Sequence, residues 1–422
     1  MKPSILMVTG EYPPRIGGVG DYTALLSSHL AELGARVVVL TTGEAAPGPF
    51  SIESRRRSTI DGQASEPLPP PQTSGSVATD HVRVLRLDRP WGFSSWMEVA
   101  SAALQSCCQI VHIQYQAAAF GMHLAANLLP GYLRLRLPRA KSVVTFHDLR
   151  VPYLLPKAGP LRRGAILALD ALSHTCVVTN QADLHALGGP GAVGSARKPK
   201  RWLIPIASNI PCSPPQDFDR QRWRRLLGID DDTFLLCYFG FMNDSKGVEF
   251  LLSALQLLAA RGVNARLLIL GGETGDIDPS NRAYSERIER LVVSLHLEDR
   301  VHWTGFLPPQ EVSAALLSCD LCVLPFRDGA SLRRGSLLAA IAHGVPTLTT
   351  IPEQDEPLLA DGENVAMVER DSPEALARAI GRLQGDAPER HRLAEGASAL
   401  ASRFTWPDIA RRHLQLYDTL LE

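Results

Sequence analysis

Three features that would assign this chain of 422 residues to a specialised class are missing from it. No uninterrupted apolar run approaches the ~18 residues that a membrane-spanning helix needs. The apolar start of the chain is too short for a signal peptide, with Glu11 and Arg15 close behind it. The seven cysteines are an odd number scattered through apolar surroundings, which argues against a disulfide framework. We therefore expect a cytoplasmic protein with reduced thiols.

Patterns for binding metals and nucleic acids are also missing. Cys319 and Cys322 have C-x-x-C spacing, but no second pair or histidine cluster accompanies them, so we interpret both as core residues. The basic residues lack interleaved aromatics and a reader motif, which makes nucleic acid a poor partner. We predict no metal site and no nucleic-acid partner.

Length and charge indicate two domains. Single cores rarely exceed roughly 250–300 residues, so we predict an N-terminal domain over 1–207, a second over 208–403 and a C-terminal helix over 404–422. Residues 1–207 carry 21 Lys and Arg against 13 Asp and Glu, a net charge of +8, and the rest carries 22 against 31, a net charge of −9. This difference suggests different partners for the two parts, although solvated surfaces give the same pattern.

The N-terminal part alternates apolar runs with helical periodicity, which is typical of a mainly parallel sheet. A glycine-rich loop at 10–21 precedes a helix predicted at 22–33, and Gly17 and Gly18 would let the backbone approach a ligand. The spacing is not the dinucleotide G-x-G-x-x-G pattern, so NAD is not favoured. Residues 43–80 are rich in Pro, Ser and Gly and are predicted to be a mobile insertion.

Two histidines fall near carboxyl ends of predicted strands, where such sheets bind ligands. His112 lies inside its strand, whereas His147 lies where its strand stops and Asp148 follows it. A lone histidine is more often a core or surface group than a catalyst, so His147 with Asp148 is the better candidate.

Two loops of the second domain carry basic residues. Lys246 ends one loop just before a helix. Arg333 and Arg334 end another, between a strand that stops at Pro325 and a helix that begins near Ser336. Helix N-termini attract anions, and Ser336 is predicted to cap the second helix. An ordinary connection with solvated basic residues would show the same pattern.

Together these segments resemble the GT-B glycosyltransferases of family 4, which are retaining enzymes. The likeness is carried by residues 11–20, 145–148, 246–247, 301–306, 320–325 and 338–346, which follow the order of the family over almost the whole chain. The resemblance implies an α/β GT-B fold: two Rossmann-like domains face each other across a cleft, and C-terminal helices pack back toward the first domain.

The sequence departs from the family at three positions. Ser331 and Ala339 stand where the family has a pair of acidic residues near the sugar and the ribose, and Phe241 stands where it usually has an arginine. We hypothesise that Arg333 or Arg334 supplies the missing guanidinium. Asp328 or another nearby acid, beside Ser331, would then contact the sugar or ribose.

The resemblance implies transfer of a sugar from a nucleoside-diphosphate sugar, with retention and without metal or another cofactor. The implied catalytic residues are Lys246, His147 and Asp148. The implied donor-diphosphate contacts are Gly17, Gly18, Arg333, Arg334, Gly335 and Ser336.

The acceptor would bind the first domain and would be a glycan, a lipid-linked molecule or a small molecule. The basic residues Arg134, Arg136, Arg139 and Lys141 in that domain suit an anionic membrane surface or a lipid-diphosphate acceptor, and equally a solvated face.

Two alternatives stay open on the sequence alone. Loss of both carboxylates would be compatible with a degenerate, non-catalytic nucleotide-binding subunit, and the same fold also serves sugar-nucleotide epimerases. Transfer or hydrolysis of a labelled sugar nucleotide separates a transferase from both.

Overall fold

The computed structural model describes residues 2–15, 17–43, 82–149, 161–189, 192–193, 198–271 and 279–422. The chain forms two compact units. Unit 1 comprises residues 1–177, 191–202 and 414–422, and unit 2 comprises residues 178–190 and 203–413. The predicted insertion at 43–80 lies, except for Gly43, outside the described residues.

Unit 1 contains a seven-stranded sheet in the order β3-β2-β1-β4-β5-β6-β9, and its neighbours from β3 to β5 pair in parallel. The strands are β1 Ser4–Thr9, β2 Arg36–Thr42, β3 Val82–Leu87, β4 Ile110–Tyr115, β5 Lys141–Phe146, β6 Thr175–Val178 and β9 Arg201–Leu203. The helices are α1 Gly18–Glu32, α2 Ser95–Gln105, α3 Ala125–Arg136 and α4 Leu161–Leu172. Every residue of β1 and β4 is buried, because helices cover both faces of a parallel sheet.

Three short elements follow β6. Helix α5 Gln181–Ala186 belongs to unit 2, and the antiparallel pair β7 Ala192–Val193 and β8 Lys198–Pro199 belongs to unit 1.

Unit 2 contains a six-stranded parallel sheet in the order β12-β11-β10-β13-β14-β15. The strands are β10 Phe234–Phe239, β11 Ala265–Leu270, β12 Val301–Trp303, β13 Leu321–Leu324, β14 Thr347–Thr350 and β15 Ala366–Val368. The helices are α6 Arg220–Leu226, η1 Asp244–Lys246, α7 Val248–Ala260, α8 Pro279–Ser294, α9 Pro309–Ser318, α10 Gly335–Ala342, α11 Pro373–Gly385, α12 Ala387–Ala401 and α13 Trp406–Leu421.

The strand order of unit 2 reverses between β10 and β13. From β10 the chain runs outward through β11 to β12, returns to β13 on the other side of β10, and continues outward to β15. In doubly wound sheets, ligands bind beyond the carboxyl ends of the strands at such a reversal. The loops after β10 and β13 therefore lie at the expected binding edge of this unit.

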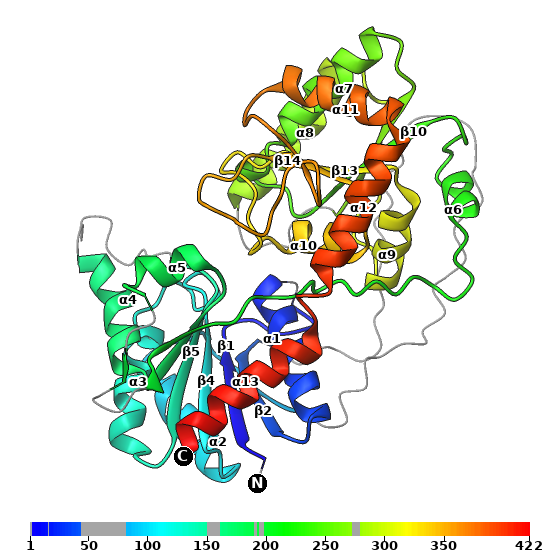
Figure 1. The fold of residues 1–422 in the computed structure, drawn as a ribbon. Coiled ribbons are helices and arrows are strands. Elements are labelled where there is room, and N and C mark those ends of the chain that lie inside the picture. Colours follow the sequence, from blue (N-terminus) through cyan, green and yellow to red (C-terminus); the bar gives the residue numbers. More distant parts are fainter. Residues whose placement is uncertain are drawn as a thin grey trace. The chain divides into compact units, whose positions relative to one another are not determined.

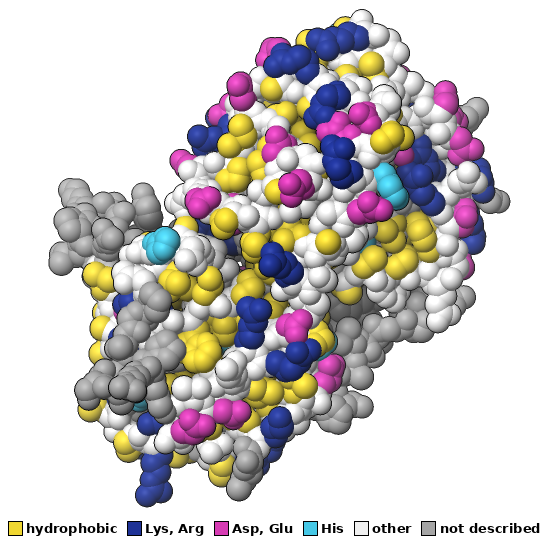
Figure 2. Space-filling view, viewed as in Figure 1, with side chains coloured by type: hydrophobic (Ala, Val, Ile, Leu, Met, Phe, Trp, Pro, Cys, Tyr) yellow, Lys and Arg dark blue, Asp and Glu magenta, His cyan; other side chains and the backbone are white. Residues whose placement is uncertain are grey.

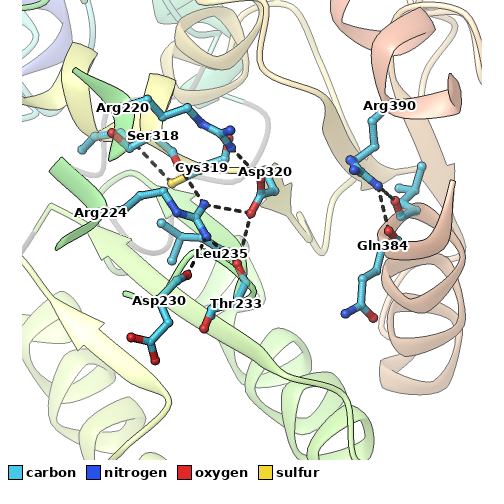
Figure 3. Close-up of polar contacts among 12 residues, drawn as sticks. Arg220, Arg224, Asp230, Thr233, Leu235, Ser318, Cys319, Asp320, Gln384 and Arg390 are labelled. Atoms are coloured by element: carbon cyan, nitrogen blue, oxygen red, sulfur yellow. Dashed lines mark hydrogen bonds and ion pairs between the residues drawn. The ribbon is translucent and has the colours of Figure 1, made fainter. Parts of the chain in front are cut away.

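A buried arginine anchors α6 at the opposite edge of the same sheet (Figure 3). Arg224 donates from Nη1 to Asp320 Oδ2 at 3.0 Å and from Nη2 to the Thr233 carbonyl at 2.5 Å. The Asp320 carboxylate also accepts from Leu235 N at 2.8 Å. A buried charge needs such partners, and these lie where β10 and β13 begin. The network therefore holds the sheet together, away from the binding edge.

The last helix, α13, ends in unit 1 (Figure 1). Tyr417 is fully buried, and its hydroxyl lies 2.6 Å from Nδ1 of His112. Nε2 of the same histidine lies 2.8 Å from Thr145 Oγ1. His112 is therefore a core residue of β4, and the end of the chain packs back on the first unit, in agreement with the predicted architecture.

The two cysteines of the C-x-x-C motif are core residues, as predicted. Cys319 and Cys322 are buried, and Cys322 lies opposite Cys237 in the β10–β13 register. In the part of the chain that the structure describes, no group of three or more His, Cys, Asp or Glu side chains is arranged to hold a metal ion.

Two surface observations concern membranes and charge. Among the described helices, none has the length and apolar character needed to span a bilayer. On the face drawn in Figure 2, basic and acidic side chains are interspersed, in keeping with a net charge of −1.

Candidate functional site

Lys246 lies at the binding edge of unit 2, where the loops after β10 and β13 meet. It ends η1, and Gly247 follows in the left-handed region with φ 65°. A Cβ atom on Gly247 would lie 2.2 Å from the carbonyl oxygen of Pro325. Glycine therefore lets the first loop pack against the end of β13. This contact brings Lys246 Nζ to 5.0 Å from the centre of the Phe326 ring.

Arg334 reaches the same ring from the second loop. Its guanidinium carbon lies 4.2 Å from the centre of the Phe326 ring, and Nε donates to the Gly329 carbonyl at 3.3 Å. The side chain is 12% exposed, against 43% for Arg333. The structure thus places Lys246 and Arg334 around one aromatic ring and leaves Arg333 more exposed to solvent.

The two cations share little negative charge. Burial and the neighbouring Arg334 lower the pKa of Lys246 to about 8, while Asp328 acts in the opposite direction. Burial also lowers the pKa of Arg334, although Asp328 forms an ion pair with it. Among the described residues, Asp328 is the carboxylate that acts on both cations, and buried like charges with so little compensation favour the arrival of an anion. Asp328, predicted as a sugar or ribose contact, is already a partner of Arg334.

The N-terminus of α10 lies beside these cations. Ser336 does not cap this helix, so that prediction is wrong: Arg334 is the N-cap residue, and Ser336 lies in the first turn without a capping bond. Its hydroxyl is buried and has no hydrogen-bond partner within the described residues. A Cβ atom on Gly240 would lie 3.7 Å from this oxygen, so it faces the loop after β10. An uncapped helix N-terminus and an orphan hydroxyl suit a phosphate group.

A carboxylate that the sequence analysis did not single out reaches the loop after β13. Glu356 follows β14, and its Oε1 accepts from Ser331 Oγ at 2.5 Å and from Leu332 N at 3.3 Å. Ala339, the other position where the resemblance implies an acidic residue, is fully buried in α10, where an ionised side chain would be costly. Three acids within residues 353–356, shortly after the apolar stretch that forms β14, are the sequence signal that could have found this residue.

The glycine-rich loop of unit 1 differs from its prediction. Helix α1 begins at Gly18, four residues earlier than predicted, and Gly17 is its N-cap residue. Oε1 of Glu11 accepts from Val19 N at 3.0 Å and Gly20 N at 3.2 Å, and a Cβ atom on Gly17 would lie 2.4 Å from its carboxyl carbon. The chain thus supplies its own anion at this helix end, while Gly18 faces open space.

Two further groups lie near this end of α1. Burial and the neighbouring Glu11 raise the pKa of Asp21 to about 6. His147, at the end of β5, packs edge-on against Tyr22 of α1 with ring centres 4.7 Å apart, and its Nε2 lies 3.0 Å from Gln114 Oε1. Asp148 follows His147 and is half-buried. These side chains lie at the carboxyl edge of the unit 1 sheet.

Two models of known protein families match this chain. Residues 17–193 match the family model described as "Glycosyl transferase 4-like domain", and residues 233–386 match "Glycosyl transferases group 1". The chain belongs to the family 4 glycosyltransferases. Both Rossmann-like units are thus accounted for, and the predicted family is confirmed.

Curated relatives agree with this assignment. A D-inositol 3-phosphate glycosyltransferase of Corynebacterium glutamicum is 29% identical over 209 residues, 49% of this chain and 48% of its own length. The match thus spans about half the length of that relative. The Xylanimonas cellulosilytica protein of the same name is 24% identical over 413 residues, which cover 95% of this chain and 91% of that protein.

Solved structures show that the fold is GT-B. Sucrose-phosphate synthase from Thermosynechococcus elongatus has a TM-score of 0.72 at 20% identity, covering 100% of this chain and 99% of that one. HepE from Anabaena, solved in complex with UDP-glucose, has a TM-score of 0.70 at 17% identity, with coverage of 99% and 100%.

In this family 4 glycosyltransferase, the structure shows which cation lies beside Lys246. Phe241, where the resemblance implies an arginine, is exposed, and residues 240–247 contain no cation other than Lys246. Arg334 from the other loop lies beside Lys246 instead. The second positive charge at the binding edge of unit 2 therefore comes from the loop after β13.

Proposed function

We propose that this protein transfers a sugar from a nucleoside-diphosphate sugar to a hydroxyl acceptor, with retention and without a bound metal. One observation carries the proposal: Lys246 and Arg334, from the two loops at the strand reversal of unit 2, meet around Phe326 beside the uncapped N-terminus of α10. Support comes from HepE, solved with UDP-glucose, and from relatives named as glycosyltransferases.

In the proposed reaction, Lys246, Arg334 and the first turn of α10 bind the diphosphate of the donor. As the bond between sugar and phosphate breaks, negative charge grows on the departing diphosphate, and preorganised positive groups stabilise it. Ser336 Oγ donates a further hydrogen bond. The acceptor hydroxyl attacks from the side of the leaving group and gives its proton to the departing diphosphate, which gives retention and requires no protein nucleophile.

Unit 1 is proposed to bind the acceptor. His147 and Asp148 at its carboxyl edge stay predicted contacts of the transferred sugar or phosphate, and Gly17 and Gly18 stay predicted contacts of the diphosphate. The relatives named for D-inositol 3-phosphate indicate that a small phosphorylated polyol is one acceptor to test, beside glycans and lipid-linked molecules.

Nucleotide binding tests the proposal directly. A thermal-shift panel with UDP, GDP and ADP should give a base-selective rise in stability, because a ligand at about 100 times its Kd adds ~2.7 kcal/mol. The rise should disappear in Lys246→Met. Incubation with the matching labelled sugar nucleotide and acceptors then shows transfer, and the anomeric proton coupling of the product shows retention. No shift with any nucleotide would overturn the proposal.

The pKa of Lys246 predicts a pH-dependent affinity for the nucleoside diphosphate. An anion prefers the ammonium form, and with a pKa of about 8 the free protein loses that form as pH rises. Affinity should fall by up to about tenfold between pH 7 and pH 9, because binding then requires proton uptake. Isothermal titration calorimetry checks this. Lys246→Arg keeps its charge and should show a flat profile; the same slope in both proteins would assign the titration to another group.

We also propose that Glu356 contacts a hydroxyl of the donor sugar. Its carboxylate is held by Ser331 and Leu332 in the loop between β13 and α10, which orients it without neutralising it. Glu356→Gln keeps the shape of the side chain and loses its charge. It should lower kcat about tenfold, the loss in rate expected when one hydrogen bond to a charged group is weakened. UDP affinity should not change. Glu353→Gln, an exposed neighbour, is the control; loss of UDP affinity in Glu356→Gln would mean a structural role.

A further inference from the structure

The outer side of two helices in unit 1 carries large apolar side chains in contact with solvent. We call this set the α2–α3 patch. It consists of Phe93 (51% exposed), Met97 (70%), Leu104 (60%), Leu128 (37%) and Leu135 (87%). Single exposed apolar residues are ordinary, but several on adjacent helices indicate an interaction surface.

Helical geometry places these side chains on one surface. Met97 and Leu104 are seven residues apart on α2, and Leu128 and Leu135 are seven apart on α3, so each pair lies on one side of its helix. The connections β3–α2–β4 and β4–α3–β5 cross the sheet in the same direction, and right-handed crossovers put both helices on the same face.

Direct contacts hold the two helices together. The ring of Trp96 in α2 stacks on Tyr132 in α3 with centres 5.0 Å apart, and Trp96 Nε1 donates to the Ala125 carbonyl at 3.0 Å. Phe93 packs edge-on against the same tryptophan at 5.0 Å. The two helices that carry the patch are therefore in direct contact.

Positive charge accompanies the patch. Residues 89–141 contain five Lys and Arg and one acidic residue, Glu98, which forms an ion pair with Arg89. Arg136, the residue after Leu135, and Arg139, just beyond the end of α3, are both exposed. Arg134 has a structural role as well, since it donates to the Ser173 carbonyl at 3.0 Å. An apolar surface edged by unopposed arginines is complementary to an anionic surface that has an apolar layer beneath it.

We propose that the α2–α3 patch docks this protein on an anionic lipid bilayer. Met97, Leu104, Leu128 and Leu135 would enter the boundary between headgroups and acyl chains, and Arg136 and Arg139 would contact lipid phosphates. A second copy of this chain is a poor occupant, because a two-fold interface would bring the arginines of one patch against those of the other. The proposal extends the sugar-transfer proposal to the acceptor side, but the docking itself requires neither donor nor turnover.

Vesicle sedimentation with the full-length chain tests this. Vesicles of equal parts phosphatidylcholine and phosphatidylglycerol should bind the protein, whereas pure phosphatidylcholine should bind it at least roughly tenfold more weakly. The double variants Met97→Ser/Leu135→Ser and Arg136→Glu/Arg139→Glu should each weaken binding to the anionic vesicles by roughly tenfold or more. All four positions are exposed, so these variants should fold.

Matched controls lie in unit 2. Val293 of α8 is 58% exposed and Arg225 of α6 is exposed, so Val293→Ser and Arg225→Glu change the same chemistry away from the patch and should leave binding unchanged. The nucleotide thermal shift, run on the patch variants, should also be unchanged, which separates failure of docking from failure of the donor site. No binding to anionic vesicles, or undiminished binding of both patch variants, would overturn the proposal.

Discussion

Replacing Lys246 with methionine is expected to lower kcat/KM by about 100-fold or more, the usual loss when one preorganised donor leaves a site that stabilises developing negative charge. The stability of the protein should not fall. The folded state lowers the pKa of this ammonium from 10.5 to about 8, so at neutral pH it holds the charge at a cost in free energy. Methionine fills similar volume without that cost. Steady-state kinetics and thermal melts of both proteins check the two expectations.

The control for this variant is Lys2→Met, which removes an exposed lysine of unit 1 and should leave both kcat/KM and the melting temperature unchanged. A Lys246→Met protein with full turnover would remove Lys246 from the catalytic machinery. A protein that loses activity together with its cooperative melt would instead show that the lysine maintains the loop after β10.

Two neighbouring arginines should respond very differently to the same substitution. Arg334→Met is expected to lower kcat/KM by about 10- to 100-fold, because its largely buried charge lies beside Lys246, where water screens it little. Arg333→Met removes an equal charge that is much more exposed, and the effect should stay below about threefold. Kinetics of the two variants side by side measure this difference.

The matched pair removes net charge as an explanation, since both variants lose one positive charge from adjacent positions. Loss of Arg334 also frees Asp328, but that carboxylate is exposed enough for solvent to stabilise it. Equal losses in both variants would mean that the loop responds to total charge, and a larger loss in Arg333→Met would assign the diphosphate contact to Arg333.

Most of the fold could be predicted because its signals are local. Strands and helices alternate along the chain as the sequence analysis predicted, and such alternation in a parallel sheet implies the layered architecture. The start of α1 was misplaced because Gly18 and Gly20 read as loop residues. Glu11, eight residues upstream of Val19, satisfies the first backbone N–H groups there, and glycine spacing alone does not reveal such a contact.

The candidate site was only partly predictable, since its members come from separate loops. Ser336 was expected to cap α10, yet its hydroxyl is buried and unpartnered within the described chain. Glu356 was missed because 25 residues separate it from Ser331, the residue that it binds. The sequence shows that these polar residues are present. Which of them lie close together depends on the order of the strands in the sheet.

The amino-acid sequence by itself determined the family and the two α/β parts, and it marked Lys246 as a candidate site residue, since these depend on local periodicity and on motifs in a fixed order. Only the tertiary structure decided that Arg334 rather than Arg333 lies beside Lys246 and that Glu356 reaches Ser331. It also decided that the apolar side chains of α2 and α3 form one surface. The physical reason is the same in each case. Pairing of β10 with β13 brings the two basic loops together, and packing of α2 on α3 brings the exposed apolar side chains together. Both contacts join residues that lie far apart along the chain.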